Sequence, residues 1–311
     1  MNILASVITM LVAVPAAAAN LSAAAATMSS TAGPVSVAVS PSSSEPPRHT
    51  RLHPSACEDQ ADCTAELQAA LDRGGTIHLA CTVGSPWITG PLNVTRNNTW
   101  LGLDAGCELL AKEGSFVGTF APLLSIRSAQ APAGCRSACT PSGELKPGFP
   151  GANAVRNISV VGVGGQATLR MRRADYNSTK YTHSEHRHGI AILGQPTGTS
   201  HSVFDVTIRN LNITLTGGDG VYVVGLDGGH IQRVHHTANY RQGSSVIDAR
   251  HVLYEDCTFT GTRGTPPMAG ESFHTCNKFP CSLNECTHTS QAVHVSRRVD
   301  YARMPACRCR H

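Results

Sequence analysis

The chain has 311 residues, of which 5% are aromatic and 15% charged, with 29 glycines and a net charge of +4. This length suffices for one large domain with a sizeable core, and the composition fits short strands and turns better than a helical bundle. The mild positive charge, with no basic run interleaved with aromatics, argues against a nucleic-acid partner.

Residues 1–19 are typical of a signal peptide. An apolar stretch from Ile3 to Val14 is followed by small residues that suit cleavage near Ala19. The stretch is shorter than the roughly 20 residues of a membrane-spanning helix, so we expect no membrane span after cleavage. Residues 20–50, rich in Ala, Ser, Thr and Pro, are predicted to be a low-complexity linker. The protein is therefore expected to be secreted, to the extracellular space or the cell wall.

Sequons and cysteines agree with passage through a secretory pathway. Six Asn-x-Ser/Thr sequons predict a glycoprotein, and they begin at Asn20, Asn93, Asn97, Asn157, Asn177 and Asn212. Twelve cysteines can pair in an oxidising compartment. Spacing alone leaves the connectivity open, and the plausible local pairs are Cys57 with Cys63, Cys81 with Cys107, and Cys135 with Cys139. The late cysteines do not repeat the spacing of a known zinc-binding pair, so no metal site is predicted.

The first predicted element is a short amphipathic helix in the segment DCTAELQAALDRGG, residues 62–75. Asp62 or Thr64 can cap its start, and Gly74 or Gly75 can end it. Its apolar face consists of Leu67, Ala70 and Leu71. A helix here can cover the open first turn of a stack of strands, whose unpaired edge would otherwise invite association.

A period of 23 residues recurs between residues 208 and 257. Ile208, Ile231 and Tyr254 follow this spacing, and Leu211, Val234 and Cys257 follow it too. A fixed period in the twenties, with short strand patterns and no helix-length stretch between them, predicts a β-solenoid in which inward residues form columns. Between Thr76 and Gly261 there is room for roughly eight turns. Two longer insertions, near 135–151 and 173–185, are expected to leave the stack as loops.

Several segments carry a resemblance to known proteins. CTAELQAALDRGGTIHLA and WITGPLNV resemble the opening of the pectin-lyase-like superfamily of right-handed parallel β-helices. SEHRHGIAILG, GGDGVYVVG, NYRQGSSVID and GTRGTPPMAG resemble a set of secreted β-helix proteins with the pattern SEWRHG, GGDGIY, NYRQGISVIS and GTxPxAGIDxEPN. This second match covers Ser184 to Gly270, after which the chain is atypical or truncated.

The resemblance implies an all-β fold, a single-stranded right-handed parallel β-helix with a short N-terminal capping helix. We place this domain at residues 51–263 and expect an irregular, Cys-rich tail over 264–311, where the apolar alternation ends.

Aligning the glycine-led strands predicts one register for the candidate site. His188-Gly189, Asp219-Gly220, Gln242-Gly243 and Ala269-Gly270 become equivalent positions. Alternation along the strands then places one set inward, Ile190, Ile192, Val221, Val223 and Val246. The same alternation places Arg187, Tyr222 and Arg241 outward, with Asp219 at the turn between the arginines. Such a face predicts a shallow groove for an acidic or neutral glycan, because arginines bind carboxylates and a tyrosine can stack on a sugar.

Roles follow from what the superfamily resemblance implies. In β-helix lyases a cation neutralises a uronate carboxylate while a base removes the C5 proton. We assign charge stabilisation to Arg241 and proton transfer to Asp219 or His188. The expected substrate-binding residues are Arg187, Tyr222, Tyr240 and Gln242. No cofactor is required by this assignment, although calcium is left open, and Arg241→Ala is expected to leave thermal stability nearly intact.

Hydrolysis is harder to support, because it needs two carboxyl groups flanking the bond. Ser272 and His274 stand where the related pattern has Asp and Glu, and Glu271 has the opposite strand parity. The sequence thus predicts a secreted, monomeric protein that acts on polysaccharide or cell-wall glycan as a lyase, epimerase or hydrolase. The alternative is a non-catalytic glycan-binding or structural extracellular protein, or an inactive relative of an enzyme, so enzymatic activity stays undecided.

Overall fold

A computed structural model describes the part of the chain that forms the predicted solenoid. The described residues are 49–57, 59, 61–81, 84–127, 154–178, 180–181, 184–194, 202–265, 269–273 and 293–299. They belong to one compact unit, residues 45–311. The predicted signal peptide and the pair Cys135 and Cys139 lie outside the described residues.

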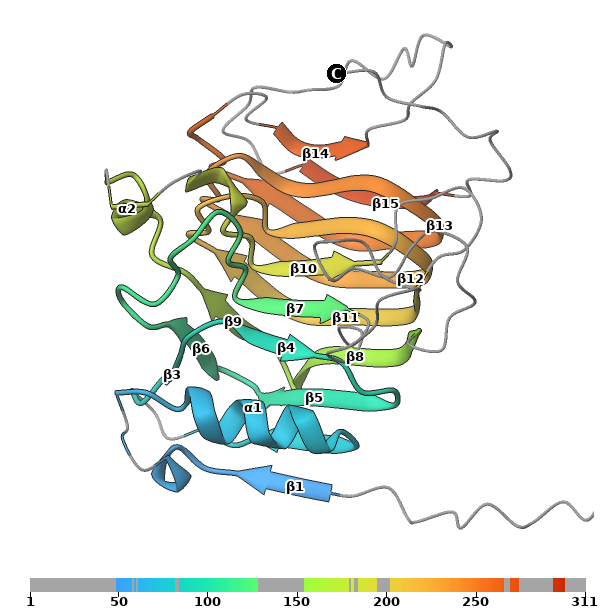
Figure 1. Cartoon of the computed structure of the whole chain (residues 1–311). Helices are drawn as coiled ribbons and strands as arrows, with labels where there is room; N and C mark the ends of the chain where they lie inside the picture. Colours follow the sequence, from blue (N-terminus) through green and yellow to red (C-terminus); the bar gives the residue numbers. More distant parts are fainter. Residues whose placement is uncertain are drawn as a thin grey trace, which may run out of the picture. The chain divides into compact units, whose positions relative to one another are not determined.

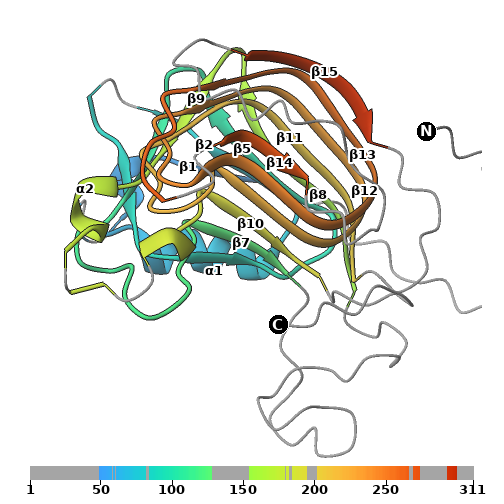
Figure 2. The same cartoon turned by 90° about the horizontal axis from the view of Figure 1, so that it is seen from above.

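The described strands form a right-handed parallel β-helix, which confirms the predicted fold class (Figure 1). Each full coil passes along three faces, named A, B and C here, and Figure 2 shows β12 and β13 curving round them. Face A comprises β4 (Leu92–Val94), β7 (Leu124–Arg127), β10 (Ile190–Leu193), the first parts of β12 (Val221–Thr237) and β13 (Gln242–Thr260), and β14 (Ala269–Phe273).

Faces B and C complete each coil. Face B comprises β1 (His49–Leu52), β2 (Thr76–Leu79), β5 (Thr99–Asp104), β8 (Val155–Val163), the first part of β11 (Val203–Thr214), and the middle parts of β12 and β13. Face C comprises β3 (Trp87–Thr89), β6 (Glu108–Ala111), β9 (Ala167–Arg170), and the last parts of β11, β12 and β13.

The 23-residue period is the vertical spacing between the last three coils of the core. Ile208 pairs with Ile231, and Ile231 pairs with Tyr254, as predicted. The column continues downward to Val160 and Leu101, and all five side chains are buried. Each coil therefore buries its apolar side against the next coil, not within itself.

Insertions reduce the number of coils below the predicted eight. From β2 to β13, face B of the described chain carries six strands, β2, β5, β8, β11, β12 and β13. The expected insertion at 173–185 does leave the stack, and it contains α2 (Arg173–Tyr176) and the 3-10 helix η2 (Ser184–His186). Such insertions lengthen individual coils, so fewer coils fit into the same length of chain.

Left-handed residues bend the long strands without interrupting their pairing. Asn210, Arg233 and Asp256 occupy equivalent positions in β11, β12 and β13, with φ values of 55°, 50° and 53°. One residue in this region redirects the chain, which lets a single strand pass from face B to face C. Periodicity alone gave no sign of which residue would make each bend.

The N-terminal helix covers the first coil as predicted. Helix α1 (Thr64–Arg73) begins where Asp62 Oδ1 accepts the N–H of Thr64 at 3.0 Å and ends at Gly74, with φ 69°. The Gln68 side chain donates to the carbonyl of Asn93 at 3.0 Å and accepts its N–H at 2.8 Å. These bonds satisfy the free edge of β4. None of the helices in the described segments has the length and apolar character to cross a bilayer.

Two predicted disulfides are confirmed. Cys57 pairs with Cys63 just before α1, and Cys81 pairs with Cys107 between the first two coils. Both join segments that the solenoid already places side by side, so they reinforce its N-terminal end.

Strands extend beyond both predicted domain boundaries. β1 begins at His49, inside the segment expected to be linker, because its backbone pairs with β2 from His49↔Thr76 onward. β14 and β15 (Val293–Val299) lie in the segment expected to be an irregular tail. β14 continues face A, with Ser272 opposite Ser245 and Glu271 opposite Ser244, which confirms their opposite parity. β15 pairs antiparallel with β13 and covers its edge.

We predict that Ile208→Asp destabilises the fold strongly, because it places an unpaired carboxylate in the central column. The expected loss is several kcal/mol, seen as a large fall in the melting temperature by circular dichroism. Arg209→Asp is the matched control, because Arg209 is the exposed neighbour on the same strand. Equal melting temperatures for the two variants would contradict the column.

Candidate functional site

The four motifs that resemble known proteins meet at one edge of the solenoid. They lie where successive coils turn from face C into face A, and we call this edge the C–A corner. The N–H of Gly189 donates to the carbonyl of Asp219, and the N–H of Gly220 donates to that of Gln242, both at 3.0 Å. Gln242 in turn pairs with Ala269. The predicted register of the glycine-led strands is therefore confirmed.

Glycine is required at this corner because coils stack there at close range. A Cβ at Gly220 would lie 2.5 Å from the carbonyl oxygen of Gly243 and 2.6 Å from Nδ1 of His236. Any side chain would force the next coil or the interior histidine to move. The repeated glycines thus reflect backbone packing, and the polar residues beside them are held rigidly.

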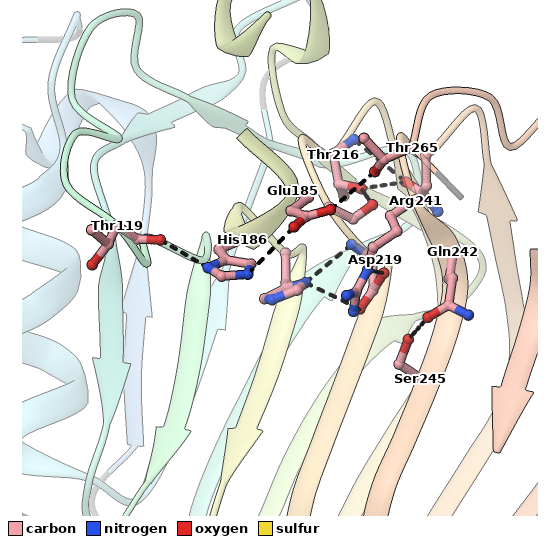
Figure 3. A network of polar contacts seen from close by, with 12 residues as sticks. Thr119, Glu185, His186, Thr216, Asp219, Arg241, Gln242, Ser245 and Thr265 are labelled. Carbon is pink, nitrogen blue, oxygen red and sulfur yellow. Dashed lines mark hydrogen bonds and ion pairs between the residues drawn. The ribbon is translucent and has the colours of Figure 1, made fainter. Parts of the chain in front are cut away.

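A buried ion pair joins Asp219 and Arg241 (Figure 3). Arg241 Nε donates to Oδ1 of Asp219 at 2.8 Å, and Nη2 donates to Oδ2 at 2.5 Å. The Asp219 side chain is 0% exposed and that of Arg241 is 19% exposed. Burial is the largest single influence and disfavours the charged guanidinium, but the hydrogen bonds to Asp219 and the negative charges of Asp219 and Glu185 together outweigh it, so the pKa of Arg241 lies above its ordinary value. Both oxygens of Asp219 are committed to orienting Arg241.

His188 is neutral and lies against the same pair. Its Nδ1 accepts the backbone N–H of Asp219 at 3.0 Å, so the ring proton resides on Nε2. Its ring stacks on Tyr222, with centroids 4.5 Å apart and planes 11° apart, and the Phe120 ring lies 5.3 Å away. Burial lowers the pKa of His188 to about 4, an effect that the nearby Asp219 carboxylate only partly offsets. A neutral ring whose Nδ1 already accepts a hydrogen bond is poorly placed to act as a base.

Arg187 does not face outward beside Arg241, contrary to the predicted alternation. Its side chain is fully buried, and it donates to the carbonyls of Phe116 at 2.8 Å and Gly118 at 2.6 Å. Alternation holds only within a strand, and β10 begins later, at Ile190. Arg187 therefore stabilises the loop over residues 112–123.

The other predicted binding residues are half-buried or buried. Gln242 is fully buried; its Oε1 accepts the Ser245 hydroxyl, and its Nε2 has no acceptor among the described residues. Tyr240 packs over Gly264, where a Cβ would lie 2.3 Å from its ring. Tyr222 is half-buried, and burial raises its pKa. Their roles in substrate binding stay predictions.

Sequence reasoning missed three residues at this corner: Phe120, Glu185 and Thr265. Glu185 is 35% exposed; its Oε2 accepts the Thr265 hydroxyl at 3.2 Å, and its Oε1 lies 3.9 Å from His186 Nε2. Phe120 is 40% exposed. Glu185 belongs to the motif SEHRHG, which could have singled it out. Phe120 and Thr265 lie on insertions from other coils, and no local pattern marks them.

No metal centre is evident at the corner. Across the segments that the structure describes, no three His, Cys, Asp or Glu side chains come together in a group that could hold a metal ion.

No protein-family model matches the chain, and no curated protein matches its sequence. Solved structures share its fold at low identity. A putative glycosyl hydrolase from Parabacteroides merdae is 16% identical with a TM-score of 0.48, over 72% of this chain and 92% of the other. An iota-carrageenase complexed to iota-carrageenan fragments is 14% identical with a TM-score of 0.43, over 67% of this chain and 42% of the other.

A third solved structure is the tailspike protein of an Acinetobacter baumannii bacteriophage, a capsular polysaccharide depolymerase. It is 11% identical with a TM-score of 0.42, over 73% of this chain and 38% of the other. These likenesses concern the fold alone. Membership of the pectin-lyase-like superfamily stays a prediction.

We predict that Asp219→Asn destabilises the protein by about 2–4 kcal/mol, because it leaves a largely buried guanidinium without its counter-charge. Arg241→Ala is expected to lower stability by a similar amount, because it leaves the buried Asp219 carboxylate without a counter-charge. This differs from the sequence-based prediction that Arg241→Ala leaves thermal stability nearly intact. Chemical denaturation measures both. Asp227→Asn is the control, since Asp227 pairs with the more exposed Arg250 and His251, and it should cost about 1 kcal/mol or less.

Acid should destabilise the folded protein through its buried histidines. Burial lowers the pKa of His188 to about 4 and that of His236, which stacks on Phe259, to about 3. Both values lie below the unfolded pKa of about 6.5, so the unfolded state binds protons first as the pH falls from about 6.5 to 4. Stability should drop by roughly 2–3 kcal/mol per histidine over that range.

Melting temperatures measured across this pH range test the acid effect. His236→Phe keeps the stacked ring and should flatten the pH dependence. An unchanged slope in this variant would contradict a neutral, buried His236.

Proposed function

We propose that the protein binds an acidic polysaccharide at the C–A corner of face A and acts on it. The observation that supports this most directly is a guanidinium oriented by a buried carboxylate close to an exposed aromatic ring. Arg241 and Phe120 supply these two groups: the Phe120 ring contacts those of His188 and Tyr222, and His188 accepts the N–H of Asp219, which binds Arg241.

The ion pair directs its positive end outward. Asp219 is fully buried beneath Arg241, whose side chain retains 19% exposure. Nε and Nη2 bind Asp219, which leaves the Nη1 edge for a ligand carboxylate. Because the guanidinium is already ordered, binding costs little further side-chain entropy. These features favour a sugar that carries a carboxylate, such as a uronate.

An exposed apolar patch lies on the same loop as Phe120. Val117 is 56% exposed and Phe120 is 40% exposed, and they are the large hydrophobic side chains exposed in the described chain. The Phe120 ring lies 6.2 Å from those of His186 and Tyr222. Aromatic rings provide rigid contact area for the apolar faces of ligands, so this loop is suited to hold a sugar ring beside Arg241.

A non-catalytic role is the second candidate. It gains support from Asp219, whose oxygens are both bound to Arg241, and from Ser272, which stands in β14 where the related pattern has a carboxylate. On this alternative the protein recognises glycan without turnover, as an extracellular binding or structural component. The proposal of secretion applies to both candidates, and it is consistent with the two disulfides.

We predict that Phe120→Ala weakens polysaccharide binding about tenfold, which corresponds to about 1.4 kcal/mol, while the melting temperature stays unchanged. Affinity electrophoresis with uronate-rich and neutral polysaccharides measures the effect. Arg209→Ala is the control, because Arg209 is exposed on face B. Equal affinity for neutral polysaccharides, or unaltered binding by Phe120→Ala, would argue against this site.

A further inference from the structure

Two carboxylates act on Arg241, and only one of them is accessible to a ligand. Asp219 binds Arg241 directly, and Figure 3 shows Glu185 at the same corner, where its negative charge also raises the pKa of Arg241. Asp219 is 0% exposed and binds Arg241 through both oxygens, whereas Glu185 is 35% exposed. A group that exchanges a proton with a substrate must reach it, which favours Glu185 over Asp219.

The fold holds Glu185 in a defined place. Its backbone packs against the turn before Asp219, because a Cβ at Gly218 would lie 2.1 Å from the Glu185 carbonyl oxygen. Its carboxylate accepts the Thr265 hydroxyl, which comes from a corner loop after β13. Figure 3 shows Glu185 between His186 and Thr265. A neighbouring coil therefore positions the backbone of Glu185, and Thr265 from another coil holds its carboxylate.

Two buried donors at the same corner lack an acceptor among the described residues. They are Nε2 of His188 and Nε2 of Gln242. The two residues take equivalent positions in the coils on either side of Asp219. Buried donors without an acceptor are uncommon and costly in native proteins, so buried water is expected beside the ion pair.

One accessible carboxylate beside a guanidinium suits elimination better than hydrolysis. Glycoside hydrolysis requires two carboxyl groups, one on each side of the bond. Asp219 is closed to a substrate, and the residue that pairs with Ser245 in the next coil is Ser272, not a carboxylate. A β-elimination requires a cation at the uronate carboxylate and one group that can accept and return a proton.

We infer that Glu185 is the catalytic acid and base of a β-elimination at the C–A corner, an inference that rests on the proposed function. Arg241 binds the uronate carboxylate. Glu185 removes the C5 proton, the C5–H electron pair forms the C4=C5 double bond, and the C4–O bond breaks. The departing oxygen keeps the electron pair of the broken C4–O bond and takes the proton from Glu185, which returns to its carboxylate form. No water or other co-reactant is consumed.

Glu185→Gln tests the inference, because the amide keeps the shape and cannot exchange the proton. On a uronate polysaccharide that the wild-type protein binds, we expect a loss of at least 100-fold in the rate at which ultraviolet absorbance of the C4=C5 bond appears. Binding and melting temperature should match the wild type. Glu113→Gln is the control, since Glu113 is an exposed carboxylate on the loop that carries Phe120, and it should retain the full rate.

The other possible results separate failure of the Glu185 assignment from failure of the proposed function. A Glu185→Gln variant with the wild-type rate would overturn the role of Glu185. New reducing ends without the absorbance would show hydrolysis and overturn the elimination. Binding by a wild-type protein that yields no product would overturn the elimination and leave the glycan site standing. Absence of binding would overturn the proposed function as well.

Discussion

In-register hydrogen bonding between consecutive coils is the constraint on which the rest of the structure depends. Backbone pairing sets each coil directly above the previous one, so side chains 23 residues apart, such as Ile208 and Ile231, become vertical neighbours. The resulting columns bury the apolar side of every coil. The same constraint demands glycine at the corner, where Gly220 meets the backbone of Gly243 too closely for a side chain. Both ends are covered, by α1 at the first coil and by β15 along β13.

Stacking also explains how the candidate site is assembled. Corner loops of different length project from neighbouring coils and meet over face A, which brings Phe120 and Thr265 beside residues of the motif SEHRHG. Arg187 ties one such loop down through the carbonyls of Phe116 and Gly118. Arg187, which was predicted to bind ligand, thus holds in place a loop at the candidate site. The loops supply the surface available for binding, and the hydrogen-bonded strands hold these loops in position.

The polar groups at the corner divide into orienting and accessible ones. Asp219 lies beneath Arg241, and His188 accepts the Asp219 N–H, so both hold other groups in place. Arg241, Glu185 and Phe120 retain exposure. Burial therefore separates residues that keep the site rigid from residues that can touch a substrate, and this division moves proton transfer from Asp219 to Glu185 in our proposal.

Sequence determined the fold class, the columns, the capping helix and the register of His188, Asp219 and Gln242, because spacing along the chain is directly translated into vertical position in a solenoid. It could not determine how deeply each side chain is buried. Arg187 precedes its strand and turns inward, and Asp219 is closed by Arg241, because both outcomes depend on loops from other coils. The strands at His49–Leu52 and Val293–Val299 were also beyond prediction, since edge pairing depends on backbone groups that any sequence possesses.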